Sequence, residues 1–593
     1  MDAVAVNGPE DLPLSLDGNG WDAIHWPSQD KQVQQLRHRI FKATQEQDWP
    51  KVRNLQKLML RSRANTLVSV RQVAQQNAGR KTPGIDGQVA LTSPTRAELA
   101  VQVHASIGTW RPRAVKRVHI PKARDRTKLR PLGIPVLADR CHQARVRNAL
   151  EPEWEARFEP RSYGFRPGRS CHDAIGAIFQ TLCLRTTRRL WILDADLAAA
   201  FDRIDHDYLL SMIGSFPARG LIREWLKAGV FEKGKGFAPT PEGTPQGGVI
   251  SPLLLNVALY GLEEAAGVRY SKETTRLGQA SPAVIRYADD LVACCFSKQQ
   301  AEQVKARLAA WLKPRGLTFN EDKTRIVHAS EGFDFLGMNV RRYAGGKLLI
   351  KPSKAAIKRI RERLAKELRS LRGANSTRVI ARLNPIIRGW AAYYRTVVSA
   401  KVFKSLDHYL WMLTYRWALR THRNRPPRWI VDRHYGKFNK FRNDRWVFGN
   451  PETGAYLLKF SWTKIERHTM VRGRASPDDP ALDDYWTARR RRVKPPLDAY
   501  TIRVLDRQDA RCVLCGEHLL SPEQPPQGPD EWERWWLQVA RKAISQDHLV
   551  YHGSRGPKGD VRSHLVHTSC HRSLMSRERM RTAKPSRASA GLA

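Results

Sequence analysis

Two adjacent carboxylates, Asp289 and Asp290, stand where one apolar run of the chain ends and the next begins. Residues 284–292 read Val-Ile-Arg-Tyr-Ala-Asp-Asp-Leu-Val, a pattern typical of two strands joined at a hairpin tip. A third carboxylate, Asp196, ends the run Trp191-Ile-Leu-Asp-Ala-Asp196, which indicates a buried strand. Carboxylates that converge at strand ends repel one another unless cations lie between them. Mg²⁺ is favoured there because it prefers hard oxygen ligands and leaves room for phosphates and water.

Three carboxylates suited to two cations predict phosphoryl transfer. Two metal ions about 3.5 to 4 Å apart stabilise both the attacking and the leaving oxygen of such a reaction. Asp196, Asp289 and Asp290 are therefore the candidate Mg²⁺ ligands and catalytic residues of a nucleotidyl-transfer enzyme.

A second group of metal-ligating residues lies near the end of the chain. The segments Cys512-Val-Leu-Cys515 and His567-Thr-Ser-Cys570 each place two ligands with two residues between them. Two such pairs predict a tetrahedral Zn²⁺ site, which would stabilise a domain that has little core of its own.

The charge balance predicts a polyanionic partner. The 593 residues contain 102 Lys and Arg against 57 Asp and Glu, a formal net charge of +45. Such a charge repels itself in a compact protein unless a polyanion offsets it, and nucleic-acid backbones are the commonest polyanion. The alternative is an ordinary solvated basic surface. Because the excess runs through most of the chain, nucleic-acid binding is the favoured interpretation.

Length and cysteine usage limit the class of protein. A chain of 593 residues exceeds what one hydrophobic core supports, so three or more domains are expected. Eight cysteines in this length do not form a disulfide framework, which indicates a reducing compartment. The first residues lack the basic and apolar regions of a signal peptide, and no later run approaches a membrane-spanning length. We expect a cytoplasmic protein associated with nucleic acid, with no membrane contact.

The elements that position these residues follow from hydrophobic periodicity. From about Gln32 to Gln76 the apolar spacing predicts helices joined near Trp49-Pro50. Between residues 82 and 343, short apolar runs alternate with helical stretches, which indicates an α/β catalytic body. Residues 353–372 predict an amphipathic helix with a basic outer side, and two more helices follow through about Arg420.

Residues 401–450 combine basic charge with aromatic rings. They hold twelve Lys and Arg, three acids and eleven aromatics. This mixture suits RNA, whose unstacked bases can lie on aromatic faces. The alternative is that the rings form the core of small helices, and we expect this for more than half of them.

Several further motifs occur in a fixed order along the chain and, together with the paired carboxylates, resemble the sequence blocks of reverse transcriptases, particularly the proteins encoded by group II introns. They are Arg130-Pro-Leu-Gly-Ile-Pro135, Ser162-Tyr-Gly-Phe-Arg-Pro-Gly168, Asp196 with Phe201-Asp202, Pro245-Gln-Gly-Gly248, Leu317-Thr-Phe-Asn320 with Lys323, and Phe333-Asp-Phe-Leu-Gly337.

The resemblance implies roles for the carboxylates and their neighbours. Asp196, Asp289 and Asp290 resemble the metal-binding triad, with Asp196 and Asp289 the direct ligands of both ions. Phe201 is similar to the aromatic residue that lies against the sugar and excludes a 2′-hydroxyl. Gln246 resembles the residue that borders the incoming nucleotide, and neighbouring glycines let the backbone approach the substrate.

The basic residues also acquire roles from the resemblance. Lys128 and Arg130 match the positions that hold the triphosphate, and Lys323 resembles a lysine near the leaving pyrophosphate that donates a proton. The alternative for each is an ordinary surface charge. Asp202 and Asp205 are expected to cap the helix that starts near His206.

One block departs from the family pattern. It reads Asp-Leu-Ala-Ala-Ala-Phe-Asp from Asp196, whereas the family more often has Ile-Lys-Gly after the aspartate. The metal ligand is retained, but the lysine is absent, which puts the details of the nucleotide pocket in question.

A maturase region is also indicated. The segment Leu383-Asn-Pro-Ile-Ile-Arg-Gly-Trp-Ala-Ala-Tyr-Tyr394 resembles domain X, which follows the polymerase thumb in group II intron proteins. The resemblance implies that the protein binds its intron RNA through phosphate, 2′-hydroxyl and shape, and that the RNA carries the splicing chemistry.

The cysteine and histidine cluster resembles an HNH endonuclease. On this resemblance His548 activates water as a general base, while Asp547 and His571 hold a catalytic divalent ion. Arg562 stands where the family has an asparagine that orients the base, and a long Trp-rich insertion separates the first cysteine pair from His548. Two interpretations stay open: an active nuclease, or a zinc-supported DNA-binding domain of nuclease ancestry.

We therefore expect a multidomain α/β fold: a right-hand polymerase with fingers, palm and thumb, an all-α maturase domain and a small ββα-metal zinc domain. The expected division is a mobile tail over 1–30, fingers and palm with the helical N-terminal region over 31–350, thumb and domain X over 351–470, a basic linker over 471–498, an HNH-like zinc domain over 499–580 and a disordered tail over 581–593.

The expected function is that of a group II intron reverse transcriptase and maturase. Such a protein copies RNA into DNA from deoxynucleoside triphosphates, assists splicing of intron RNA and nicks target DNA during retrohoming. The alternative is a maturase-only splicing factor with an inactive HNH domain, and the presence of all three carboxylates argues against it. A reverse transcriptase recruited to defence is disfavoured by the domain X match and the zinc cluster.

Overall fold

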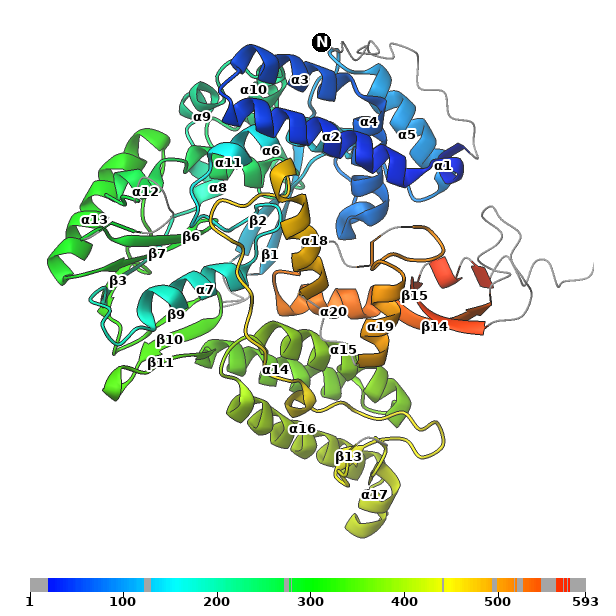
Figure 1. The fold of residues 1–593 in the computed structure, drawn as a ribbon. Helices are drawn as coiled ribbons and strands as arrows, with labels where there is room; N and C mark the ends of the chain where they lie inside the picture. Colours follow the sequence, from blue (N-terminus) through cyan, green and yellow to red (C-terminus); the bar gives the residue numbers. More distant parts are fainter. Residues whose placement is uncertain are drawn as a thin grey trace, which may run out of the picture. The chain divides into compact units, whose positions relative to one another are not determined.

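The computed structural model describes residues 20–121, 129–270, 277–278, 280–439, 442–492, 499–516, 518–519, 526–545, 561–568, 570–572 and 574–575. The chain divides into two compact units (Figure 1). The first contains residues 1–331 and 470–486, and the second contains residues 332–469 and 487–593. Within the described residues, no helix has both the length and the apolar surface needed to cross a bilayer.

The first unit begins with a helical region that confirms the periodicity of residues 32–76. Its elements are α1 Gly20–Ala23, α2 Trp26–Gln45, α3 Trp49–Arg61, α4 Arg63–Arg71, a π-helical turn Gln72–Gln76, a 3-10 turn Ala78–Lys81 and α5 Ser93–Ala105. Asp48 caps α3 by accepting from Lys51 N at 3.1 Å, so the break at Trp49-Pro50 is a capped helix start.

The predicted mobile tail over residues 1–30 is wrong for residues 20–30, which are helical apart from two residues between α1 and α2. The side chain of Trp21 is only 1% exposed and packs among buried residues of α4 and α5, and its indole N–H donates to Gln75 at 3.2 Å. The composition of the preceding residues, rich in Gly and acidic residues, predicted a mobile tail and gave no indication that Trp21 is buried. Residues 1–19 lie outside the described part of the chain.

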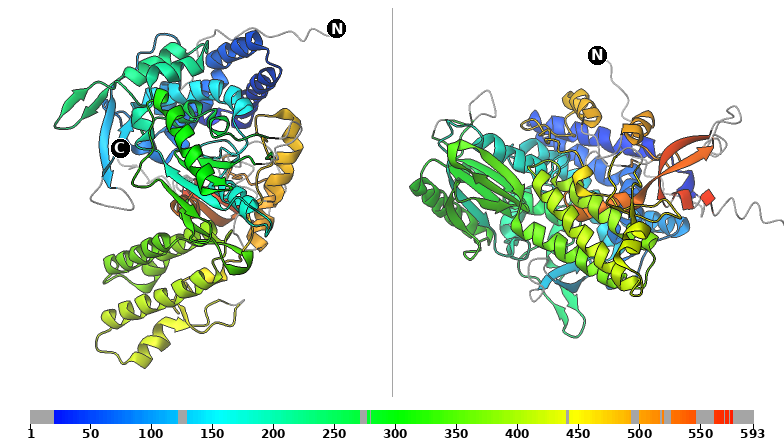
Figure 2. Two further views of the ribbon diagram at one scale, coloured as in Figure 1. Left: turned by 90° about the vertical axis from the view of Figure 1, so that its left-hand side faces the viewer. Right: turned by 90° about the horizontal axis from the view of Figure 1, so that it is seen from below.

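The body of the first unit contains two sheets and the helices that cover them (Figures 1 and 2). One sheet has the order β2-β1-β4-β5 and the other the order β6-β7-β3-β8. The elements are β1 Val115–Pro121, β2 Leu129–Ile134, α6 Leu137–Arg157, α7 Cys171–Leu182, β3 Trp191–Asp196, α8 Ala200–Arg203, α9 His206–Ile213, α10 Arg219–Lys227, β4 Val230–Glu232, β5 Gly236–Ala238, α11 Ser251–Ala258, α12 Leu262–Ala265, β6 Ala283–Tyr287, β7 Asp290–Cys295, α13 Lys298–Leu312 and β8 Arg325–His328.

The second sheet supports the hairpin predicted from residues 284–292. All of its strand pairs are antiparallel, and α13 packs against β3, β7 and β8. Leu193, Val284 and Ala293 are completely buried in the core beneath it. The neighbouring residues Ile192, Ile285 and Val292 point to the other face of the sheet and are also completely buried, so both faces of this sheet are covered.

The predicted linker over residues 471–498 is wrong for its first half, since residues 470–486 pack against the first unit. Asp478 forms an ion pair with Arg37 of α2 at 2.7 Å, and Arg169 donates to the carbonyl of Gly473 at 2.8 Å. Trp486 is 5% exposed and covers Gly168, where an added Cβ would lie 2.6 Å from the ring. The polar composition of this segment concealed a buried ring and a buried ion pair. Residues 493–498 lie outside the described residues.

The second unit contains a three-stranded sheet, a layer of helices and a small terminal region. The sheet β11-β10-β9 is antiparallel, and all of it belongs to this unit, which begins at residue 332. The expected boundary after residue 350 would instead divide β11. The elements are β9 Phe333–Phe335, β10 Met338–Arg342, β11 Leu348–Pro352, α14 Lys354–Ser370, α15 Ser376–Tyr394, α16 Ala400–Thr421, α17 Pro427–His434, β12 Tyr435–Gly436, β13 Val447–Phe448, α19 Ala499–Arg507, α20 Pro529–Gln538, β14 Val539–Ser545 and β15 Val561–His567. Helix α18 Asp483–Arg492 begins in the first unit, and its residues from 487 onward are counted with the second.

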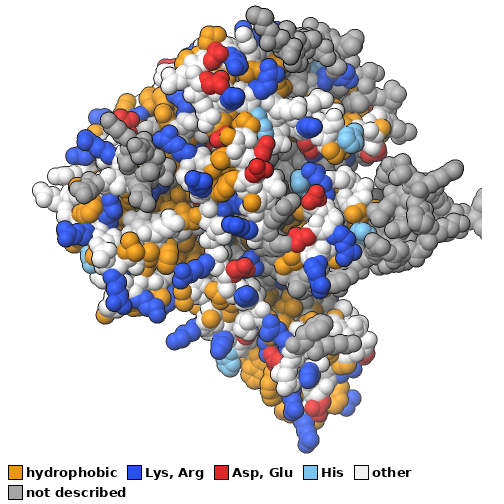
Figure 3. Space-filling view, viewed as in Figure 1, with side chains coloured by type: hydrophobic (Ala, Val, Ile, Leu, Met, Phe, Trp, Pro, Cys, Tyr) orange, Lys and Arg blue, Asp and Glu red, His pale blue; other side chains and the backbone are white. Residues whose placement is uncertain are grey.

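The helices α14, α15 and α16 confirm the three helices expected between residues 353 and 420, and they pack against one another. Ala356, Ile360, Leu364 and Leu368 form the buried stripe of α14. Lys and Arg side chains are spread over the face of the molecule shown in Figure 3 and do not gather in a single patch.

Candidate active site and candidate metal centre

The hairpin of β6 and β7 brings the three carboxylates together. Tyr287 pairs with Asp290 across the hairpin, which leaves Ala288 and Asp289 at its tip. Asp196, the last residue of β3, lies directly opposite Asp290 on the neighbouring strand. Residues opposite each other in an antiparallel pair project on the same side of the sheet, with Cβ atoms about 4.5 to 5.5 Å apart. The amide of Leu197 donates to the carbonyl of Asp289 at 3.3 Å, which holds the tip beside the end of β3.

Burial and neighbouring charges of both signs act on this cluster of carboxylates. Burial raises the pKa of Asp289, and the charge of Asp196 raises it further, whereas Arg130 and Lys323 lower it. Lys323 donates a hydrogen bond to the carboxylate of Asp196, and the carbonyl of Asp196 accepts from Asn320 N at 2.8 Å. All three carboxylates are partly exposed. Half-buried carboxylate oxygens at one edge of a sheet match the donors that Mg²⁺ prefers.

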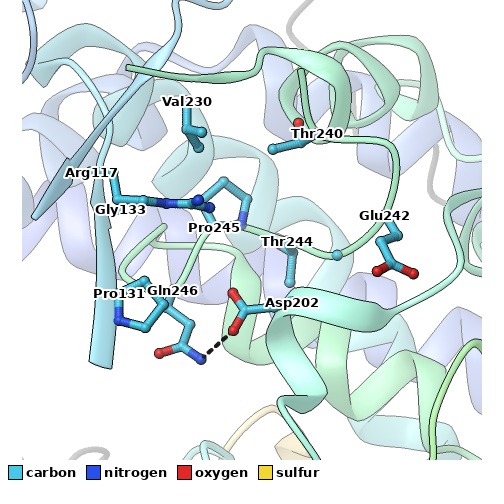
Figure 4. A pocket seen from close by; sticks show the side chains of 11 residues that line it. Arg117, Pro131, Gly133, Asp202, Val230, Thr240, Glu242, Thr244, Pro245 and Gln246 are labelled. Atoms are coloured by element: carbon cyan, nitrogen blue, oxygen red, sulfur yellow. Dashed lines mark hydrogen bonds between the residues drawn. The ribbon is translucent and has the colours of Figure 1, made fainter. Parts of the chain in front are cut away.

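The residues expected around the nucleotide lie on the segments that flank this cluster. Phe201 lies in α8, immediately after the turn that follows β3. Its ring contacts that of Phe165 edge-on, with the ring centroids 6.2 Å apart. Gln246 donates from Nε2 to a carboxylate oxygen of Asp202 at 3.2 Å (Figure 4). Arg130 is exposed on β2, and Lys128 lies outside the described residues.

The two aspartates expected to cap a helix differ. Asp205 is the N-cap of α9 and accepts from Tyr208 N at 2.7 Å, which confirms the prediction. The prediction is wrong for Asp202, which lies inside α8 and binds Gln246 instead. Capping was expected from the local sequence alone, whereas the partner of Asp202 is 44 residues away.

The cysteine and histidine pairs also converge. Candidate ligand atoms of Cys512, Cys515, His567 and Cys570 all lie within 4.8 Å of one another. Tetrahedral Zn²⁺, with Zn–S of about 2.3 Å and Zn–N of about 2.0 Å, separates its ligand atoms by roughly 3.5 to 4 Å. Hydrogen bonds from Cys515 and Cys570 lower the pKa of the Cys512 thiol, whereas hydrogen bonds to Cys512 and Cys570 and the charges of these neighbouring thiolates contribute to a raised pKa at Cys515. The donor set and its spacing fit zinc.

Among the described residues, a small buried apolar cluster lies beside these four candidate ligands. Cys512 and Cys515 follow α19, His567 ends β15, and the buried apolar residues beside them are Val504, Leu505, Leu519, Leu565 and Val566. The expected HNH residues Asp547 and His548 lie outside the described residues. His571 is described and half-buried, and the backbone of Arg562 pairs with Ile544 in the β14–β15 ladder. The predicted nuclease site therefore stays a prediction.

The Trp-rich insertion forms helix α20, which packs on α15. Arg363 of α14 binds Asp530 at 2.8 Å and Glu533 at 2.6 Å. The guanidinium of Arg388 lies 4.8 Å from the ring centroid of Trp536. The sequence analysis noted this insertion only as an interruption of the zinc domain. Asp530 and Glu533, three residues apart and interleaved with tryptophans, could have predicted an amphipathic helix that packs on another helix.

The rings of residues 401–450 are mostly packing residues, as expected. Among the described rings only Trp446 is classed as exposed, at 54%, and it meets Trp411 edge-on at 6.2 Å. The buried members among the described residues are Phe403, Trp417, Tyr435 and Phe448.

Comparisons with known proteins agree with this geometry. The reverse transcriptase (RNA-dependent DNA polymerase) family matches residues 120–340, the N-terminal domain of reverse transcriptase matches residues 21–103, and the group II intron maturase-specific domain matches residues 357–436. Together with the carboxylate site, these matches define a reverse transcriptase. The chain belongs to the group II intron-encoded proteins, which join a reverse transcriptase to a maturase domain.

Individual relatives support the same assignment. The chain is 34% identical to Protein YkfC of Escherichia coli (strain K12) over 49% of this chain and 84% of that protein. It is 31% identical to Group II intron-encoded protein LtrA of Lactococcus lactis subsp. cremoris over 41% of this chain and 49% of LtrA, about half its length. It is 26% identical to Maturase-like protein 1 of Euglena gracilis over 62% of this chain and 76% of that protein.

Proposed function

We propose that this reverse transcriptase copies RNA into DNA at the cluster of Asp196, Asp289 and Asp290, with Asp196 and Asp289 as ligands of both Mg²⁺ ions. The observation that carries the proposal is the placement of Asp196 opposite Asp290, beside the hairpin tip that bears Asp289. The bound ions stabilise the charge that develops on the attacking and leaving oxygens.

The chain's own residues bind and orient the substrates. Phe201 lies against the sugar of the incoming deoxynucleotide and excludes a 2′-hydroxyl. Gln246 borders the same nucleotide, and Arg130 with Lys128 holds the triphosphate. Lys323, whose ammonium reaches the carboxylate of Asp196, supplies a proton to the leaving pyrophosphate. Its nearness to Asp196 supports this role over that of an unrelated surface charge.

The test is primer extension by the purified full-length chain on an RNA template with deoxynucleoside triphosphates and Mg²⁺. The wild type is expected to extend the primer, and Asp196→Ala and Asp289→Ala to lose extension while keeping their affinity for template RNA. Wild-type extension rates in either variant would refute its assignment as a metal ligand.

We propose that the maturase domain binds intron RNA and stabilises the catalytically active fold of that RNA, and that the protein acts in the cytoplasm. The basic outer side of α14 and the net charge of +45 support binding to phosphate. Splicing of the intron RNA at low Mg²⁺ with and without protein tests this activity. Equal splicing rates would refute it.

For the terminal region we propose a zinc-supported domain that binds the target DNA and nicks one strand. The four-ligand cluster supports the zinc part of this proposal. Nicking of a supercoiled plasmid that carries the target site, compared between wild type and His548→Ala, distinguishes an active nuclease from a domain that only binds DNA.

A further inference from the structure

The loop that carries Gln246 is tied to the turn after β3 by contacts that do not involve its side chain. Thr244 N donates to the carbonyl of Phe201 at 2.5 Å, and Gly243 N donates to the carbonyl of Ile204 at 2.8 Å. Gly243 has φ +83, and an added Cβ there would collide with the backbone of Asp202. From the other sheet, Gly133 N donates to the carbonyl of Gln246 at 2.5 Å. The backbone position of residues 243–246 is therefore set independently of side chain 202.

The side chain of Gln246 is held by Asp202. The two side chains meet at the edge of a small cavity that is also lined by Arg117, Pro131 and Thr240, while Glu242 stands apart from the pair (Figure 4). An ionised carboxylate only accepts hydrogen bonds, so Asp202 selects the amide orientation in which the NH₂ group of Gln246 faces it. The carbonyl oxygen of the amide therefore faces away from the carboxylate of Asp202.

We propose that Asp202 is a positioning residue: it fixes the amide orientation of Gln246 and so determines how tightly the incoming nucleotide binds. This inference rests on the proposed role of Gln246 at the nucleotide. Asp202 adjoins Phe201 in sequence, so one short helix presents both the ring that faces the sugar and the carboxylate that orients the amide.

Asparagine at position 202 breaks this arrangement without removing volume. An amide both donates and accepts, so Asp202→Asn permits both orientations of Gln246. The backbone bonds of residues 243–246 remain, and we expect the chain to fold normally. The hydrogen bond lost is one to a charged group, and we expect the KM for the deoxynucleotide to rise about tenfold while kcat changes less than about threefold.

The experiment is single-nucleotide extension on an RNA template with wild type, Asp202→Asn, Gln246→Ala and the double variant. If Asp202 acts through Gln246, the double variant has the KM of Gln246→Ala alone. The matched control is Asp205→Asn, because asparagine remains a good N-cap for α9 and its KM should equal that of the wild type. Selectivity for deoxynucleotides over ribonucleotides is measured in parallel, since a disturbance of α8 would also displace Phe201 and lower it.

The outcomes separate this inference from the proposed function. Raised KM in Asp202→Asn, unchanged sugar selectivity and a non-additive double variant support it. If Gln246→Ala raises KM but Asp202→Asn does not, or if the two effects multiply, the positioning role is overturned while the polymerase assignment stands. A loss of sugar selectivity in Asp202→Asn also overturns it. An unchanged KM in Gln246→Ala removes the role of Gln246 and the inference with it, and absence of extension by the wild type refutes the proposed function itself.

Discussion

The carboxylate site of the first unit and the cysteine–histidine site of the second unit differ in what holds their ligands in place. Asp196 and Asp290 stand at the ends of strands and Asp289 stands at the hairpin tip, and other residues of these strands, such as Leu193 and Val284, are completely buried. Their positions are set by a large core and a fixed register. Metal binding at this site is therefore expected to add chemistry to a structure that already exists.

The cysteine–histidine site has the opposite relation to its surroundings. Among the described residues of this region, Cys512 is itself one of the six that form the buried core, and Cys515 and Cys570 pack against that core. Where the ligands are the core, the free energy of metal binding is also the free energy of folding. The comparison teaches that removing metal should abolish the activity of the carboxylate site without unfolding the first unit. At the cysteine–histidine site, removing metal should unfold the surrounding region.

The largest effect is expected from Asp289→Ala. Loss of a ligand of both ions should lower primer extension on RNA at least about 10³-fold, because electrostatic stabilisation of the transition state is removed. Affinity for RNA, measured by filter binding, should stay within about twofold of the wild type. Asp207→Ala, which removes an exposed carboxylate of α9, serves as the control and should keep full extension. If Asp289→Ala unfolded the first unit under the assay conditions, this would contradict the view that the core, and not the metal, holds the site in place.

The next effect tests the zinc centre. In Cys512→Ser, the zinc content of the purified chain should fall from about one ion to none, because the alcohol does not replace a thiolate ligand. DNA binding or nicking should be lost, while primer extension persists. Cys183→Ser removes a half-buried thiol of the first unit and should retain the ion. If Cys512→Ser keeps normal amide protection in β15, the metal does not fold this region.

A smaller effect is expected at the contact of α20 with α15. An added Cβ at Gly389 would lie 2.5 Å from the carbonyl oxygen of Pro529 and 2.7 Å from Glu533 N. Gly389→Ala should therefore displace α20, although alanine favours the helix α15 by about 1 kcal/mol. Hydrogen exchange of the amides of residues 529–538 should accelerate. In the control Gly220→Ala, where nothing lies within 4 Å of the new Cβ, exchange of these amides should not change.

The smallest expected effect concerns how stability changes with pH. The change due to Glu263 of the first unit should be opposite in direction to the change due to zinc binding in the second unit. Burial, with a contribution from Glu159, raises the pKa of Glu263 from 4.5 to about 7. A raised folded-state pKa favours the protonated form, so stability is fully present below pH 4.5 and is lost as the pH rises through about 7. The melting temperature of the wild type relative to Glu263→Gln should fall across this interval. Zinc-dependent stability should change in the opposite direction, because thiolates protonate as the pH falls. A constant difference between wild type and Glu263→Gln across this interval would contradict the raised pKa of Glu263.

Much of the site was visible in the sequence because its information is local. The Tyr-Ala-Asp-Asp tip, the strand that ends at Asp196 and the paired ligands of the zinc cluster are defined by residue type and short spacing. The periodicity of residues 354–370 likewise predicts a helix with its buried stripe. These patterns can be recognised without knowing the tertiary contacts, because each reflects the geometry of a single strand, turn or helix.

Only the tertiary structure decided which distant residues meet. The bond between Asp202 and Gln246, the return of residues 470–486 to Arg37 and Arg169, and the docking of α20 against Gly389 join positions 44 to several hundred residues apart. Local composition suggested a cap, a linker and an interruption at these places. The physical reason is that a polar or glycine-rich segment shows its role only through the group it contacts, and that contact is created by the folding of the rest of the chain.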